Sequence, residues 1–216
     1  MIATNLRPYD VAGVPLVTFG GDIRPFAWSR VPVLEHAALG FDYAFAPSLT
    51  SSTDDGNDIR TSWDHGDLAL RVPVRLGKHA RAPQIAMTIG YGWLGFSFAE
   101  TGPLAAEIPT VTYRFVRVGA SGEVALGKRL SLMAAFDYLA PLSDGSVYER
   151  FRDPTINGID ARLGLGLGIA KDTRLHLIFD YTRFFSSFVP IPGDAYVAGG
   201  ALDQFGSVKL GIEYGR

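Results

Sequence analysis

The feature that most constrains this chain is a strict alternation of apolar residues with small or charged ones. It runs through residues 36–45, 68–76, 130–138 and 159–169. Successive side chains of an extended strand point to opposite sides, so each of these segments has one apolar face and one small or charged face. A helix would need apolar residues at intervals of three and four, which these segments lack. The pattern predicts β-strands.

The composition of the second face indicates where that face points. A soluble sheet usually shows water a face rich in Lys, Glu, Thr and Gln, whereas here Gly and Ala are interrupted by single charges. Such a face fits a confined interior, where a glycine leaves room for an arginine from another strand. The ionisable side chains expected inside are Asp42, Arg71, Arg75, Arg117, Glu123, Asp137, Asp160, Arg162, His176, Asp180, Lys209 and Glu213. Buried charges must be paired, and a nearly balanced interior predicts a plugged barrel rather than a selective pore.

The order of segments predicts an all-β, antiparallel, up-and-down transmembrane β-barrel of 8–10 strands, with ten narrowly preferred. Short connections alternate with long ones at 47–61, 99–109, 142–157 and 188–203, as in outer-membrane barrels. Residues 1–216 form one domain, in which 1–14 are a first strand or a periplasmic extension. Either residues 1–12 add a tenth strand, or residues 1–32 lie outside the wall and eight remain. Strands are expected near 15–28, 33–46, 62–76, 84–98, 110–126, 130–141, 158–170, 174–187 and 204–214.

Aromatic residues gather toward the long connections, as expected of rings at a membrane–water boundary. The alternative is that strands are rich in aromatic residues in any β-protein, but this does not predict clustering at one end. The expected girdle consists of Tyr43, Phe45, Trp63, Tyr91, Trp93, Tyr113, Phe115, Phe136, Tyr138, Phe179 and Tyr181, with Tyr214 at the opposite boundary.

With these patterns the chain resembles the small bacterial outer-membrane β-barrels, the class that includes OmpA-, OmpX- and OmpW-like proteins. Its last strand, 208–214, is similar to the aromatic-ended terminal strand of that class, although Gly215 and Arg216 follow the aromatic residue. The resemblance implies a location in the bacterial outer membrane, with membrane lipid and lipopolysaccharide as partners. Because no leader pattern follows Met1, this location requires a leader that was removed or not included.

Composition removes several other classes. No apolar run approaches the roughly 18–20 residues of a membrane helix, and a formal net charge of −2 argues against a general nucleic-acid binder. Cysteine is absent, which excludes disulfides and thiol chemistry. Gly90, Gly92 and Gly95 match a dinucleotide-binding pattern, but they lie late in a strand that opens no helix. No cofactor and no metal are predicted.

Two clusters of ionisable residues have the residue types of a catalytic or cation site. The first contains Asp54, Asp55, Asp58, Asp64 and Asp67 with His65, in or beside the first long connection. Carboxylates with a histidine can activate water or bind a divalent cation, although a solvated acidic loop is the simpler interpretation. In the second, His176 and Asp180 share one face but lie about 13 Å apart at strand rise. Each therefore needs a partner from another strand.

The leading functional hypothesis is a non-enzymatic outer-membrane anchor or scaffold, because a barrel of this size encloses little more than its own side chains. Its long loops would then contact an envelope protein or surface polysaccharide. One alternative is an outer-membrane hydrolase of lipid or peptide that uses His65 with Asp64 or Asp67, or uses His176. The others are a narrow channel for small solutes and a soluble lipocalin-like binder, whose apolar faces would line a cavity.

Overall fold

The computed structural model describes residues 13–31, 34–52, 58–79, 81–99, 110–143, 151–194 and 197–215. These residues form ten antiparallel strands and no helix, and they accordingly contain no helix long and apolar enough to cross a membrane. The strands are β1 (Val17–Ile23), β2 (Ala38–Phe45), β3 (Leu49–Ser52), β4 (Asp58–Arg75), β5 (Gln84–Phe98), β6 (Val111–Ala125), β7 (Leu130–Ser143), β8 (Thr155–Ala170), β9 (Thr173–Ser187) and β10 (Gly200–Tyr214).

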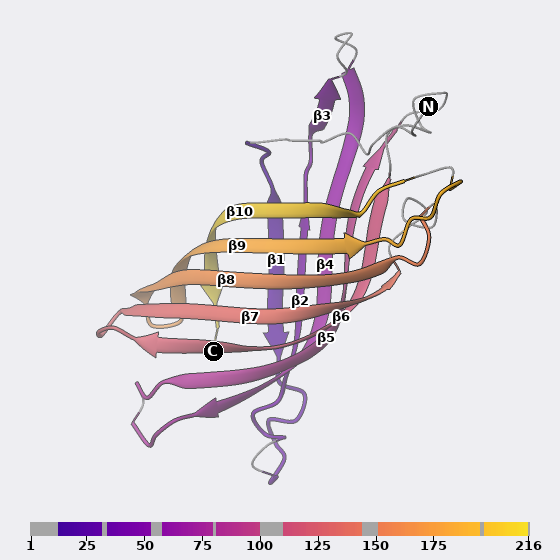
Figure 1. Cartoon of the computed structure of the whole chain (residues 1–216). Helices are drawn as coiled ribbons and strands as arrows, with labels where there is room; N and C mark the ends of the chain where they lie inside the picture. The colour runs from indigo at the N-terminus through magenta and orange to yellow at the C-terminus, as the bar shows by residue number, and fades with distance from the viewer. Residues whose placement is uncertain are drawn as a thin grey trace.

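Nine of these strands follow one another in a single sheet, in the order β1-β2-β4-β5-β6-β7-β8-β9-β10, while β3 pairs only with β4. The sheet is curled into a half-barrel, and β7–β10 pass in front of β1, β2 and β4 (Figure 1). Among the described residues the ladder stops at β1 and at β10, which are therefore its two edges. The predicted all-β, up-and-down architecture is confirmed.

All nine predicted strands are present, and the first of them is shorter than predicted. The strand expected at 15–28 ends at Ile23, and a turn follows in which the amide of Ala27 donates to the carbonyl of Arg24. Pro25, which lacks an N–H, stands where the strand stops. The alternative that placed residues 1–32 outside the wall is wrong, because β1 pairs with β2 from Val17↔Phe45 to Ile23↔Leu39.

The tenth strand of the structure is β3, which lies within the connection predicted at 47–61 and extends the β4 hairpin. It is not part of the continuous path of the sheet. The tenth strand expected from residues 1–12 lies outside the described residues.

The two faces of the curled sheet differ as the alternation predicts. Leu132 and Leu165, on the convex face, are 37% and 42% exposed, whereas Arg117 on the concave face is 2% exposed. Soluble sheets bury their apolar face, since that burial drives folding. Here the face that carries Arg117 is enclosed, and the alternating leucines of β7 and β8 lie on the opposite, exposed face.

The enclosed face changes character along the strands. Toward the long connections it carries an apolar cluster in which the rings of Tyr113 and Phe184 stack, with centroids 3.8 Å apart. The ionic residues lie next along the strands, and small residues follow toward the short turns. A hollow of about 240 Å³ opens among the small residues, with Gly164, Met133 and Ile178 in its lining.

Candidate functional site: an ion-pair network on the enclosed face

The centre of the network is Arg117 on β6, which is almost completely buried. Its guanidinium donates to Asp67 of β4 at 2.7 Å and to Asp137 of β7, and lies 3.5 Å from Asp160 of β8. These carboxylates are themselves only 1–4% exposed. Removal of ions from water costs several kcal/mol for each ion, which only paired geometry offsets. Arg117 thus ties β6 to its neighbour β7 and also to β4 and β8, which are not paired with β6.

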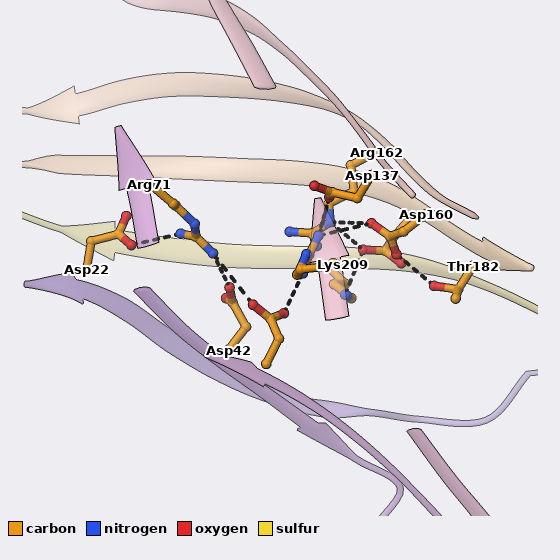
Figure 2. A network of polar contacts seen from close by, with 11 residues as sticks. Asp22, Asp42, Arg71, Asp137, Asp160, Arg162, Thr182 and Lys209 are labelled. Carbon is orange, nitrogen blue, oxygen red and sulfur yellow. Dashed lines mark hydrogen bonds and ion pairs between the residues drawn. The ribbon is translucent and has the colours of Figure 1, made fainter. Parts of the chain in front are cut away.

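A second part of the network surrounds Arg162 on β8. Its Nε atom lies 3.0 Å from Asp160 and 3.3 Å from Asp180 of β9. Lys209 of β10 donates to Asp180 at 3.2 Å, and the hydroxyl of Thr182 donates to Asp160 at 2.8 Å. Figure 2 shows Arg162, Asp160, Thr182 and Lys209 close to one another. The network therefore reaches the β10 edge of the sheet.

The third part surrounds Arg71 on β4 and reaches the other edge. Its guanidinium donates to Asp22 of β1 at 2.8 Å and to Asp42 of β2 at 2.7 Å (Figure 2). Gly40 makes room for it, because a Cβ atom there would lie 2.7 Å from the guanidinium carbon of Arg71. The sequence predicts this arrangement, in which a glycine on one strand leaves room for an arginine side chain from another.

The residues predicted for the interior divide into three groups. Eight of the twelve belong to the network just described, namely Asp42, Arg71, Arg117, Asp137, Asp160, Arg162, Asp180 and Lys209. Near the short turns, Glu123 pairs instead with Arg174 at 3.1 Å, and His176 with Glu213 at 2.6 Å. Arg75 is exposed at the end of β4. The expected partners of His176 and Asp180 from other strands are thus Glu213 and Lys209.

Two members of the network were missing from the predicted interior set. Asp67 was assigned to the acidic loop cluster, although it is two residues from Ala69 and four from Arg71 and so shares their face. Asp22 was not in the predicted set either, although the alternation of its strand places it on the face opposite Phe19 and Ile23. The alternation alone could have found both residues.

Part of the predicted aromatic girdle is wrong. Tyr113 and Phe115 are 0% and 1% exposed inside the apolar cluster, and Trp63 packs against the same cluster. Tyr113 and Phe115 share the parity of Arg117 along β6, so one strand cannot turn them outward and Arg117 inward. The other predicted girdle residues lie on the outward face by their register, namely Tyr43, Phe45, Tyr91, Trp93, Phe136, Tyr138, Phe179, Tyr181 and Tyr214.

Several outward aromatic residues have polar partners on the same face. The indole N–H of Trp93 donates to Asp64 at 2.9 Å, and the hydroxyl of Tyr181 donates to Gln204 at 2.7 Å. The hydroxyl of Tyr138 donates to Asn157. Each of these side chains thus exposes an apolar ring on the outward face while its N–H or hydroxyl group forms a hydrogen bond.

The first acidic cluster is not assembled into a site by the described residues. Asp64 faces outward, and Asp67 is bound to Arg117 inside. His65 lies inside between the rings of Trp63 and Phe115, with centroid distances of 6.3 and 6.4 Å. Asp54, Asp55 and the side chain of Asp58 lie outside the described part. Within that part, no group of three His, Asp or Glu side chains is placed to hold a metal ion.

No protein-family model, no curated protein and no solved structure matches this chain. The functional argument therefore depends on the geometry alone. That geometry is an all-β sheet curled into a half-barrel, with a charged enclosed face and an exposed apolar face.

Proposed function

We propose that this protein is an integral outer-membrane β-barrel that acts as an anchor or scaffold. The observation that carries the proposal is the inverted distribution of polarity: exposed Leu70, Leu132 and Leu165 outside, and buried ion pairs around Arg117 inside. Contiguous exposed apolar surface marks an interaction surface in soluble proteins. A surface that extends over the convex faces of many strands fits hydrocarbon better than one protein partner.

The outward aromatic residues support the same proposal. Trp93, Tyr138 and Tyr181 carry their polar partners near the long-connection ends of their strands, where a membrane–water boundary would lie. Arg60 and Arg114 are exposed at the same end. Their guanidinium groups suit the phosphate groups of lipopolysaccharide, since arginine binds such groups in a bidentate manner.

The filled interior supports a scaffold rather than a bulk pore. The apolar cluster around Tyr113 and Phe184 and the ion pairs around Arg117 occupy successive levels of the enclosed face. Contacts with an envelope protein or surface polysaccharide would then use the long connections.

A depth-dependent substitution series tests the membrane location. Leu165→Arg places a charge at the middle of the outward face of β8, and in a bilayer it should cost roughly 2–4 kcal/mol of folding stability. Gln204→Arg, at the aromatic level, is the matched control and should cost roughly 0–1 kcal/mol. Folding into lipid vesicles is followed by the gel shift between heated and unheated samples. Equal, small effects of both substitutions, together with solubility without detergent, would overturn the proposal.

A hydrolase is the second candidate, favoured by one arrangement near the short turns. His176 Nε2 lies 2.6 Å from Glu213, and its Nδ1 atom is buried with no hydrogen-bond partner. A Cβ atom at Gly166 would lie 2.7 Å from Ser131 Oγ and 3.5 Å from that Nδ1, so serine and imidazole flank one gap. Nucleophile, base and carboxylate occur in this order in serine hydrolases.

The test is hydrolysis of a p-nitrophenyl ester by the folded protein. Activity that is lost in Ser131→Ala and in His176→Ala, with the gel shift retained, would establish this function. An inactive wild-type protein would reject it.

A further inference from the structure

The end of the sheet opposite the long connections is strongly basic. In an up-and-down sheet the connections after every second strand meet at one end, and here they are 24–37, 76–83, 126–129 and 171–172. This end, the turn rim, follows the left and lower parts of Figure 1. Its exposed cations, including the last residue of β4, are Arg24, Arg30, Arg75, Lys78, Arg81, Lys128, Arg129 and Lys171.

The positive charge of the turn rim is not compensated by the chain itself. Within the described residues these eight cations form no ion pair. The four connections contain only two carboxylates, Glu35 and Asp172. Other carboxylates near the rim already have a basic partner, in the pairs Glu123–Arg174 and Glu213–His176. The rim therefore offers its charge to an anionic partner outside the chain.

The longest of these connections also exposes aromatic side chains. Trp28 is 80% exposed and Phe26 is 44% exposed, and both lie between Arg24 and Arg30 in the sequence. The amide of Ser29 donates to the carbonyl of Phe26 at 2.8 Å, which closes a turn in this segment. Tryptophan is enriched at membrane–water interfaces, where its ring lies at the level of the lipid headgroups. Guanidinium groups at that level can bind phosphate.

The turn rim is continuous with the exposed apolar face of the sheet. Leu76, Leu126 and Ile169 are 48–57% exposed, and each lies within two residues of a rim cation. Long basic side chains at such a boundary lay their hydrocarbon stems on apolar surface and extend their charges away from it. A layer of lipid headgroups can meet all four connections at once, whereas one soluble protein would have to cover the whole end of the sheet.

We propose that the turn rim binds the anionic phospholipid headgroups of the membrane leaflet at this end, with Trp28 in the headgroup layer. The inference rests on the proposed membrane location and goes beyond it, because it specifies the lipid charge that this end recognises. Each Lys or Arg close to an anionic leaflet strengthens binding about fivefold. At ~1 M salt the Debye length falls to about 3 Å, so this attraction should largely disappear.

Quenching of Trp28 fluorescence by brominated lipids tests the lipid preference. Trp63→Phe with Trp93→Phe leaves Trp28 as the only tryptophan of the full chain, and the gel shift between heated and unheated samples verifies folding. Should this background fail to fold, Trp28→Phe in the otherwise unchanged chain gives the signal of Trp28 by difference. All vesicles contain equal parts of phosphatidylglycerol and phosphatidylcholine, and only one of the two lipids carries bromine on its acyl chains.

Two variants locate the preference on the chain. Arg24→Gln with Arg30→Gln removes the cations that flank Trp28. The matched control, Arg152→Gln with Arg183→Gln, removes two cations near the long connections, at the opposite end of the sheet.

We expect brominated phosphatidylglycerol to quench Trp28 more strongly than brominated phosphatidylcholine. The preference should fall about fivefold for each rim cation removed, vanish at high salt, and persist in the control. Equal quenching by the two lipids, or equal effects of the two double substitutions, would overturn this inference and leave the membrane location intact. Equal quenching with a response of Trp28 to added polyphosphate would assign the rim to a soluble polyanion instead. Absence of quenching by either lipid would refute the membrane location and this inference together.

Discussion

Arg117→Ala should be among the most destabilising single substitutions in this protein. The lost guanidinium contacts Asp67, Asp137 and Asp160, all of which are enclosed. Arg162 remains 3.0 Å from Asp160 and 4.0 Å from Asp137, so these two carboxylates keep a cation. The cost therefore falls mainly on one residue.

That residue is Asp67, whose nearest remaining cation is Arg71, with the nitrogen 4.0 Å from Oδ1. Breaking a buried ion pair by removing one partner costs about 3–5 kcal/mol, because it leaves an uncompensated charge. We expect Arg117→Ala to lower the free energy of unfolding by that amount. Asp67→Asn in the same background should restore part of it, since an amide requires no counter-ion.

The assay is urea unfolding in detergent micelles, followed by the fluorescence of the three tryptophans, Trp28, Trp63 and Trp93. Arg174→Ala is the matched control, because it removes an ion pair whose two side chains are 52% and 35% exposed. Exposed pairs contribute roughly 0–1 kcal/mol. A loss for Arg117→Ala no larger than that of the control, or no restoration by Asp67→Asn, would show that the interior is hydrated and refute the reasoning.

Two further predictions concern packing and pH. Gly158→Ala should cost about 1–3 kcal/mol in the same unfolding assay, because its Cβ atom would lie 2.7 Å from the Phe184 ring. Gly211→Ala is the control and should have almost no packing effect, because a Cβ atom there meets no atom within 4 Å. Equal losses of stability in the two variants would contradict this account. Hydrogen bonds from Arg152 and a backbone amide hold the pKa of Asp194 below its ordinary value. Their contribution is present above the ordinary carboxyl pKa and is lost as pH falls through the lowered one. Carboxyl-carbon NMR should show Arg152→Ala raising the pKa of Asp194, and an unchanged value would exclude the ion pair in solution.

Much of the wall was predictable because strand periodicity is local. The alternation along 130–138 and 159–169 correctly assigned Leu132 and Leu165 to one face and Asp137 and Arg162 to the other. The wrong girdle assignments arose because aromatic residues near the long connections were placed on the outward face even where the alternation of their strand places them inside. Tyr113 is the clearest example, since its strand also carries Arg117 on the same face.

The sequence by itself determined the strands, their faces and the need for charge compensation, because backbone geometry makes every second residue face the same way. It could not determine which carboxylate pairs with which cation. Asp67 and Arg117 are fifty residues apart and lie on strands that are not hydrogen-bonded neighbours, yet they form a buried ion pair. Their side chains come within 3 Å because β4 and β6 both pair with β5, where Gly92 lies opposite Asp67 and Gly90 lies opposite Arg117. That pairing belongs to the tertiary structure and not to any one strand.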